Sequence, residues 1–189
     1  MMRSIRFASS PVAALRPRFE RFTLAGAGLS GAMALFLAIA ATQPARAEWI
    51  DSGERAYARQ DYTRSAAAFM RRALLGQAKA QTYLGYMYAN GRGVPQDYVA
   101  AAQWLRRAAD QGFPTAQFLL GLLYDKGHGV RQDFVEAEVW LNLAAGNADT
   151  KQRDYWTRIR NSVASKLTLA ELADAQRRAL EWAPLQERR

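Results

Sequence analysis

The fold is decided by a stretch that occurs twice. Residues 80–112 read AQTYLGYMYANGRGVPQDYVAAAQWLRRAADQG, and residues 116–148 read AQFLLGLLYDKGHGVRQDFVEAEVWLNLAAGNA, so equivalent residues lie 36 positions apart. The recurring positions are Gly85, Tyr88, Gly91, Gly93, Asp97 and Trp104 in the first copy, and Gly121, Tyr124, Gly127, Gly129, Asp133 and Trp140 in the second. A fixed period of about 20 to 50 residues is typical of stacked repeat proteins. The period therefore predicts a repeat architecture.

Each copy contains two helical stripes of apolar residues with a glycine-rich turn between them. In the first copy the stripes are Ala80, Leu84, Met87 and Tyr88, and then Ala101, Trp104, Leu105 and Ala108. Gly91 follows the first stripe, where a left-handed residue closes a helix. Asp97 precedes the second stripe, where a carboxylate caps the free N–H groups of a helix. Each copy therefore predicts an antiparallel helix pair.

Gly85 and Gly121 fall inside the first predicted helix of each copy. Glycine costs about 1 kcal/mol relative to alanine at such a position. We expect a close approach of the two helices to require it, with Trp104 or Trp140 covering the missing side chain.

The flanking residues extend the same pattern more weakly. Residues 48–78 predict a degenerate N-terminal helix hairpin, because apolar residues recur at helical spacing but the Gly-x-Gly-Val turn is missing. Repeat 1 then covers 79–114, repeat 2 covers 115–149, a C-terminal capping helix pair covers 150–183, and 184–189 form a tail. Thr168 and Glu171 have capping-box spacing for the last helix. The predicted fold is all-α: an α/α superhelical solenoid of about three to four helix hairpins.

The first 47 residues have the composition of a targeting segment. Five arginines precede an uncharged run over 23–43, which is followed by Ala45-Arg46-Ala47. This order predicts a secretory signal peptide that is cleaved after Ala47, and hence a periplasmic or secreted protein. The run is also about long enough to span a membrane, so an uncleaved inner-membrane anchor over 23–42 stays open. An arginine-rich start without acids is also compatible with a mitochondrial presequence.

The composition excludes several functional classes. The 189 residues carry a formal charge of +9, but residues 48–189 hold 20 basic and 16 acidic groups. This small excess does not predict binding to nucleic acid. The chain has no cysteine, so it has no disulfide, thiolate metal site or lipidated anchor cysteine.

The two copies resemble a known family. Residues 80–112 and 116–148 look like Sel-one-like repeats, helix pairs related to the tetratricopeptide repeat, with the pattern A-x-x-x-L-G-x-x-Y-x-x-G-x-G-V-x-x-D-x-x-x-A-x-x-W-x-x-x-A-A. The resemblance implies a stacked module that holds partner proteins or peptides, often in the periplasm or at the cell surface. In some exported relatives, cysteines crosslink the two helices of each hairpin. This chain has none, so activities proposed for those relatives are not transferred to it.

No residue pattern predicts catalysis, a cofactor or a metal site. His128 is the only histidine and is expected to lie exposed in the Gly127–Gly129 turn. The Gly-x-Gly turns follow a helix and lack the Gly-Lys-Ser/Thr ending of a phosphate loop. Asp97 and Asp133 are expected to be helix caps, so the chain is predicted not to be an enzyme.

The candidate partner-binding residues stand at positions where the repeat pattern specifies no residue type. They lie on the first helix of each copy, on the face expected to line the concave side: Thr82, Tyr86 and Asn90, then Phe118, Leu122 and Asp125. Tyr86, Phe118 and Leu122 would form an exposed apolar strip that receives a partner segment. The alternative is that these three side chains pack between neighbouring hairpins.

The sequence leaves several functions open. The first is a non-catalytic envelope scaffold that binds a partner protein or peptide, and the second is a membrane-tethered regulatory subunit. An enzyme acting on cell-wall material is a third, for which no acid/base pair is evident. The pairs Arg71-Arg72, Arg106-Arg107 and Arg177-Arg178 are expected to be solvated helix faces, with a basic surface for anionic lipid or polymer as the alternative.

Overall fold

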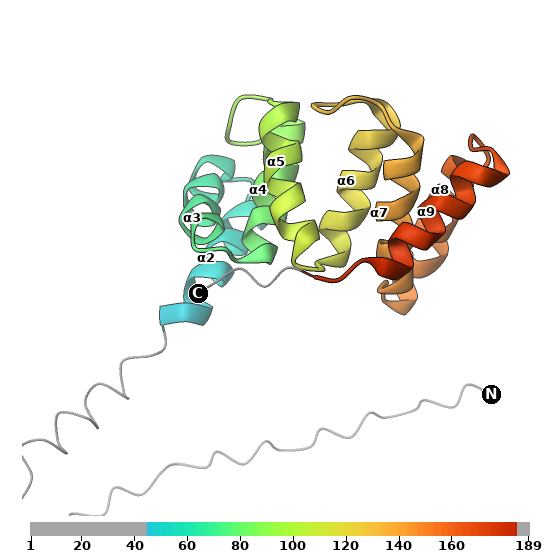
Figure 1. Cartoon of the computed structure of the whole chain (residues 1–189). Helices are drawn as coiled ribbons and strands as arrows, with labels where there is room; N and C mark the ends of the chain where they lie inside the picture. Colours follow the sequence, from blue (N-terminus) through green and yellow to red (C-terminus); the bar gives the residue numbers. More distant parts are fainter. Residues whose placement is uncertain (1–44, 185–189) are drawn as a thin grey trace, which may run out of the picture. The chain divides into compact units, whose positions relative to one another are not determined.

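The structure is a computed structural model that describes residues 45–184, and this part of the chain is helical throughout (Figure 1). Its helices are α2 (Ala45–Ala58), α3 (Tyr62–Leu74), α4 (Ala78–Asn90), α5 (Tyr98–Asp110), α6 (Pro114–Lys126), α7 (Phe134–Gly146), α8 (Thr150–Ala164) and α9 (Leu169–Glu181). The predicted all-α solenoid is confirmed. The predicted signal peptide or anchor falls almost wholly on residues 1–44, outside the described residues. No helix within 45–184 has the length and hydropathy needed to cross a membrane.

Three helix hairpins follow one another along the stack: α2 with α3, α4 with α5, and α6 with α7 (Figure 1). From α2 to α8, each helix packs against the next one in the chain. The buried apolar residues form three clusters, one centred on Phe69 and Met87, one on Leu105 and Leu120, and one on Leu141 and Trp156. The core therefore runs along the stack, as a repeat protein requires.

The two C-terminal helices do not form a fourth hairpin of the same kind. Both α8 and α9 pack against α7. The capping box of Thr168 and Glu171 starts α9 as predicted, and α9 then runs back along α7. At its end the Trp182 ring lies 3.4 Å from the position that a Cβ at Gly112 would occupy, in the turn between α5 and α6.

The helices of each hairpin approach most closely at the interior glycines. A Cβ built on Gly85 would lie 2.6 Å from Leu105 Cγ, and one on Gly121 would lie 2.7 Å from Leu141 Cγ. The expected close approach is therefore confirmed. The prediction that Trp104 or Trp140 covers the glycine is wrong, because the leucine that follows each tryptophan fills this space.

The first hairpin uses the same device with a shorter turn. A Cβ on Gly53 would lie 2.9 Å from the Phe69 ring, so Gly53 of α2 meets α3 as Gly85 meets α5. The partner residue comes 16 positions after Gly53 but 20 positions after Gly85 and Gly121. The spacing in the first hairpin is thus four residues shorter, which is the length of the missing Gly-x-Gly-Val turn. The first hairpin is thus a repeat with a deletion, and Gln60, with φ of 63°, takes the left-handed position in its turn.

Each glycine-rich turn also sets the spacing between hairpins. Gly91 and Gly127 close their helices in the left-handed conformation, as predicted. The second glycine of each turn lies directly on the preceding hairpin: a Cβ on Gly93 would be 2.2 Å from Tyr62 O, and one on Gly129 would be 2.0 Å from Tyr98 O. Neither position has room for a side chain, so these glycines allow the hairpins to stack.

The aspartates that follow these turns are helix caps, as predicted. The Asp97 carboxylate accepts the N–H groups of Val99 and Ala100, at 2.8 and 2.9 Å. The Asp133 carboxylate accepts the N–H of Glu136 at 2.9 Å. These hydrogen bonds satisfy donors that a helix start leaves free, so both aspartates are used by the fold.

Candidate partner-binding site

An apolar pocket lies between α2, α4 and α6, which come from the three successive hairpins. It has a volume of about 440 Å³ and is lined by Tyr57, Lys79, Thr82, Tyr83, Tyr86, Phe113, Thr115 and Leu119. We call it the junction pocket. On α4 its residues are Lys79, Thr82, Tyr83 and Tyr86, which form one stripe at helical spacing. The opposite stripe of α4, with Leu84 and Met87, is buried in the core.

The walls of the junction pocket are held by aromatic packing. The Tyr83 ring stacks on Phe69, with centroids 4.5 Å apart and an interplanar angle of 4°. Tyr57 lies 5.9 Å from Tyr83 and 6.5 Å from Tyr86, centroid to centroid. Burial, together with the Glu54 carboxylate, raises the pKa of Tyr83. The Tyr83 phenol is therefore neutral at neutral pH and offers a hydrogen-bonding group beside an apolar wall.

Two cations border the junction pocket. Lys79 Nζ forms an ion pair with Glu54 Oε1 at 2.5 Å. The Arg92 guanidinium donates a hydrogen bond to the Tyr57 hydroxyl and lies 5.5 Å from the centroid of the Tyr86 ring. The pocket thus combines an apolar, aromatic floor with positive charge at its edge.

The two repeats differ at the α4 positions that line the pocket, among them Thr82. Thr82 of α4 corresponds to Phe118 of α6, 36 residues later. At the next junction Phe118 stacks on Trp156 of α8, with ring centroids 4.8 Å apart at 10°, and both rings are buried. The smaller Thr82 makes no such ring contact and lines the junction pocket.

The structure separates the six predicted binding residues. Thr82 and Tyr86 line the junction pocket, but Thr82 is only 5% exposed, which contradicts the expectation that it lies on an open face. Asn90 is exposed at the end of α4, where its amide donates a hydrogen bond to Tyr86 O at 2.7 Å. Leu122 is half-buried against the core cluster that contains Phe118.

The expectation that Phe118 and Asp125 lie on an open face is wrong. Phe118 is 6% exposed and packs between hairpins, which was the alternative interpretation. Asp125 is 5% exposed and forms ion pairs with Lys126, at 3.1 Å, and with Lys166. Asp125 also falls one position out of register, since the repeat counterpart of Asn90 is Lys126.

The Asp125 ion pairs predict a measurable contribution to stability. Burial raises the pKa of Asp125, but hydrogen bonds from Lys166 and Lys126 outweigh it and lower the pKa overall. Lys166→Ala is expected to cost roughly 1 kcal/mol near neutral pH, a modest value because Lys166 is partly exposed. A lowered carboxyl pKa stabilises the fold at neutral pH, and this stabilisation is lost as the pH falls through the folded-state pKa.

Urea unfolding of the wild type and of Lys166→Ala, at neutral pH and at about pH 3, checks this prediction. The difference should be smaller at about pH 3 than at neutral pH, because Asp125 takes up a proton in acid. Lys151→Ala, on the exposed side of α8, is the control and should change little at either pH. A difference for Lys166→Ala that is equal at both pH values would contradict the role of Asp125.

Sequence reasoning missed most of the junction pocket. Tyr57, Lys79, Tyr83, Phe113, Thr115 and Leu119 were not among the predicted residues. A signal was present, because positions 79, 82, 83 and 86 are spaced as one helical stripe and the repeat pattern is silent at each of them. On α4 the predicted residues, 82, 86 and 90, were taken at every fourth position, and so they left this stripe.

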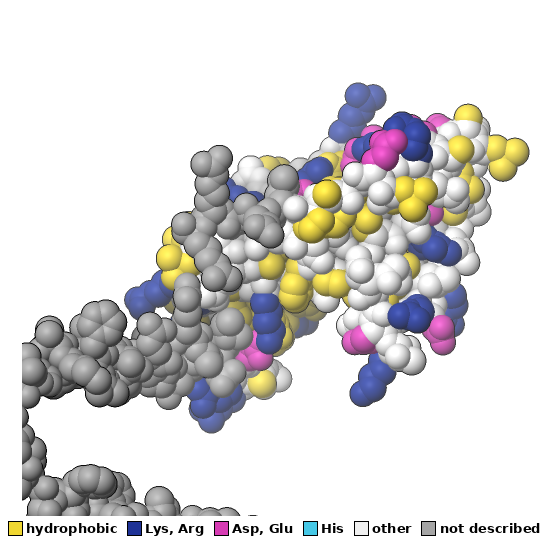
Figure 2. Space-filling view, turned by 60° about the horizontal axis from the view of Figure 1, so that its bottom comes forward, with side chains coloured by type: hydrophobic (Ala, Val, Ile, Leu, Met, Phe, Trp, Pro, Cys, Tyr) yellow, Lys and Arg dark blue, Asp and Glu magenta, His cyan; other side chains and the backbone are white. Residues whose placement is uncertain are grey.

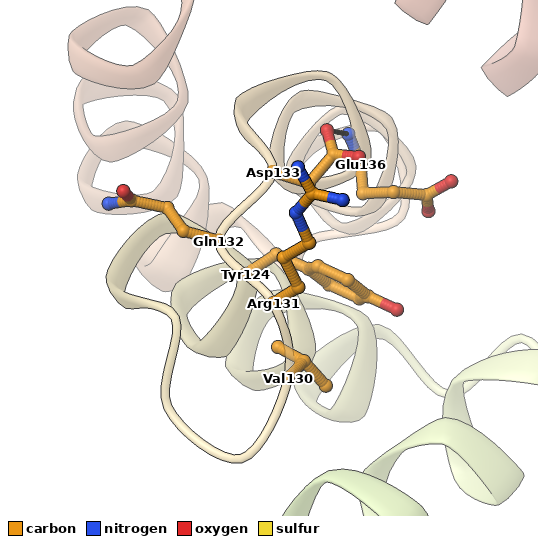
Figure 3. A pocket seen from close by; sticks show the side chains of 6 residues that line it. All are labelled: Tyr124, Val130, Arg131, Gln132, Asp133 and Glu136. Atoms are coloured by element: carbon orange, nitrogen blue, oxygen red, sulfur yellow. Dashed lines mark hydrogen bonds between the residues drawn. The ribbon is translucent and has the colours of Figure 1, made fainter.

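A second hollow lies at the turn between α6 and α7 (Figure 3). Its volume is about 660 Å³, and Tyr124, Val130, Arg131, Gln132, Asp133 and Glu136 line it. Its two acids serve the fold: Asp133 caps α7, and Glu136 pairs with Arg178 of α9 and accepts a hydrogen bond from Trp140 Nε1 at 3.2 Å. Figure 3 shows the Gln132 side chain pointing away from Tyr124 and Glu136. This hollow offers no acid that is free for chemistry.

The remaining titratable groups do not assemble a catalytic site. Within residues 45–184, no group of three or more His, Asp or Glu side chains could hold a metal ion. Glu138 has a pKa raised to about 7 by burial, although the Arg160 charge opposes the shift. Its side chain is nearly fully buried on α7, so it is not placed to meet a substrate. His128 is exposed, as expected, and its ring packs 4.5 Å from Tyr98.

The arginine pairs are not uniformly solvated. Arg72 is buried, with 8% of its surface exposed, which contradicts the expectation for the first pair. The Arg106 guanidinium lies 5.4 Å from the centroid of the Tyr124 ring and 5.2 Å from the centroid of the Trp140 ring. Figure 2 shows apolar side chains across the face that it presents, with Lys and Arg side chains mainly toward the margins. Several arginines therefore pack against aromatic rings.

A comparison with protein families identifies the repeated unit. The model of the Sel1 repeat matches residues 78–113 and 114–149. Each match begins one residue before the boundary predicted from the sequence. No curated protein matches the chain.

Two solved structures are similar to this chain. One is a protective antigen present in uropathogenic Escherichia coli strains that displays an SLR fold, with 29% identity, a TM-score of 0.68, and coverage of 78% of this chain and 32% of that chain. The other is a Sel1 repeat protein from Oxalobacter formigenes, with 29% identity, a TM-score of 0.55, and coverage of 70% of this chain and 54% of that chain. This chain therefore spans between about a third and about half of these longer proteins.

Repeats of this family generally form non-catalytic scaffolds for interactions between proteins. The helix pairs, their turns and their stacking are those of such a scaffold. The chain therefore carries two repeats that match the model of the Sel1 repeat, at 78–113 and 114–149.

Proposed function

We propose that this protein is a non-catalytic scaffold of the bacterial cell envelope that binds a partner protein or peptide in the junction pocket. One observation carries the proposal: an apolar pocket of about 440 Å³, walled by Tyr57, Tyr83, Tyr86, Phe113 and Leu119, lies between α2, α4 and α6. A preformed apolar pocket with a few polar groups at its edge is the usual form of a binding site. A single large side chain of an extended segment fits a volume of about 440 Å³.

The envelope location rests on the N-terminal sequence. An arginine-rich start, an apolar run and Ala45-Arg46-Ala47 are typical of an export signal. The similar Escherichia coli structure is that of a protective antigen, which supports a location outside the cytoplasm. Fractionation of a tagged chain, followed by N-terminal sequencing, tests this part. A mature start at Glu48 is expected, whereas an intact segment over 23–42 in the membrane fraction would favour the tethered regulatory subunit.

Selection of peptides on the full chain tests the binding site. A random peptide library displayed on phage is selected on the wild type, and the recovered peptides are then measured against Thr115→Trp. Because the indole would fill the junction pocket, affinity should fall by about tenfold or more. Thr150→Trp is the matched control, since Thr150 is exposed in the first turn of α8.

The control variant should bind the selected peptides as the wild type does. Circular dichroism and thermal melting show whether both variants keep the fold. If Thr115→Trp is folded and binds every selected peptide with unchanged affinity, the junction pocket is not the binding site.

A further inference from the structure

Arg92 connects the first repeat turn to the junction pocket. It lies between Gly91 and Gly93, and its guanidinium is 5.8, 5.5 and 5.5 Å from the ring centroids of Tyr57, Tyr62 and Tyr86. It also donates a hydrogen bond to the Tyr57 hydroxyl. Tyr57 and Tyr86 are themselves pocket residues. Three aromatic rings therefore hold a cation at the edge of the site.

The second repeat does not have an arginine at the middle of its turn. The counterpart of Arg92 is His128, and the counterpart of Tyr62 is Tyr98. The His128 ring packs on Tyr98, with centroids 4.5 Å apart, so both turns place their middle residue against the preceding hairpin. The longer arginine reaches beyond that aromatic ring to Tyr57 and Tyr86. The turn residue thus contributes charge to a groove in the first repeat only.

The positive charge of Arg92 is not neutralised by a carboxylate within residues 52–184. Glu54 forms its ion pair with Lys79, which lines the pocket. Arg92 forms its hydrogen bond to a neutral phenol, and a guanidinium has five N–H donors in a planar fork. An arginine held by stacking with donors to spare is well suited to bind a carboxylate.

We propose that Arg92 binds an Asp or Glu side chain of the partner segment whose large apolar residue fills the junction pocket. This inference rests on the proposed function and names the chemistry of the partner. The pocket lies open to solvent, so an extended chain can pass across it, and the proposed carboxylate is that of a side chain rather than of a chain end. Since Tyr57 and Tyr86 border both the pocket and Arg92, the acid should lie within about two residues of the apolar anchor.

A double-mutant cycle tests the pairing of charges. The probes are the tightest-binding peptide from the phage selection and its counterpart with Glu→Gln or Asp→Asn next to the anchor. Both are titrated by fluorescence anisotropy against the full-length wild type and Arg92→Gln. Neutralising the acid of the peptide, or replacing Arg92 by Gln, should each weaken binding by about 10- to 100-fold. The two changes together should weaken it little further.

Three further measurements keep the outcome clear. Arg92→Lys should retain part of the affinity, because it keeps the charge but not the planar fork. The neutral peptide should bind the wild type and Arg92→Gln alike, which excludes unfolding as the cause. Amidating the C-terminus of the acidic peptide should change little. A large loss on amidation would assign the carboxylate to a chain end and overturn the inference.

The inference and the proposed function can fail separately. If Thr115→Trp abolishes binding but the selected peptides carry no acid, or the two charge changes are simply additive, only the role of Arg92 is overturned. If Thr115→Trp leaves binding intact, the junction pocket is not the site, and both fail.

Discussion

Replacement of Gly129 by alanine should destabilise the protein by roughly 3 kcal/mol or more, because the left-handed backbone and a steric clash act together. The new Cβ would lie 2.0 Å from Tyr98 O and 2.2 Å from Tyr98 C in the preceding hairpin. Backbone atoms cannot turn aside as a side chain can, so the two hairpins must separate. Unfolding in urea, followed by far-UV circular dichroism, measures the loss.

Gly127 provides the matched control for this effect. Its φ is 69°, against 70° for Gly129, so alanine is strained to the same degree at both positions. A Cβ on Gly127 meets nothing closer than Gln132 Cβ, at 3.1 Å. Gly127→Ala should therefore cost only about 1 to 2 kcal/mol. Equal losses at the two positions would contradict the claim that the second glycine sets the hairpin spacing.

Removal of the buried charge of Glu138 should have the second large effect. Glu138 is 2% exposed, and its Oε2 has no hydrogen-bond partner in the described part of the chain. Burial raises its pKa from 4.5 to about 7, with Arg160 opposing the shift. Glu138→Gln keeps the shape of the side chain without the charge. It should stabilise the protein at about pH 8 by up to about 3 kcal/mol.

The pH dependence of this effect has a defined sign. Between pH 4.5 and about 7 the folded protein keeps the Glu138 proton, whereas the unfolded chain releases it. Stability therefore decreases as the pH rises through this range. Urea unfolding at several pH values should show that Glu138→Gln removes this decrease. The exposed Glu181 is the control, and Glu181→Gln should change stability by less than about 0.5 kcal/mol. A Glu138→Gln protein that is less stable than the wild type at about pH 8 would refute the prediction.

The sequence predicted those parts of the fold that depend on local chemistry. Local backbone geometry accounts for the left-handed glycines at 91 and 127 and for the capping aspartates at 97 and 133. The residue type alone indicates each of these positions, without knowledge of any distant contact. Gly53 was missed because its turn is four residues shorter, so it falls out of the 36-residue register. The structure reveals its role through its contact with Phe69.

The binding site was predicted less well because it depends on contacts between repeats. Tyr86 and Phe118 both belong to an apolar stripe in the sequence, but only the structure shows that Trp156 of α8 covers Phe118. The periodic pattern likewise indicates that Gly85 faces a neighbouring helix without revealing whether Trp104 or Leu105 fills the space. Arg92 differs from His128 in the sequence, yet its reach to Tyr57 depends on how two hairpins stack.

The most direct test of the binding site is a crosslink between a bound peptide and the pocket. The tightest-binding selected peptide is synthesised with a photoreactive benzoylphenylalanine in place of its apolar anchor, irradiated with the full chain, and mapped by mass spectrometry. The account predicts adducts on the residues that line the junction pocket, chiefly Tyr83, Tyr86, Phe113 and Leu119. Adducts confined to α7 or α9, at residues such as Val139 or Trp182, would contradict it.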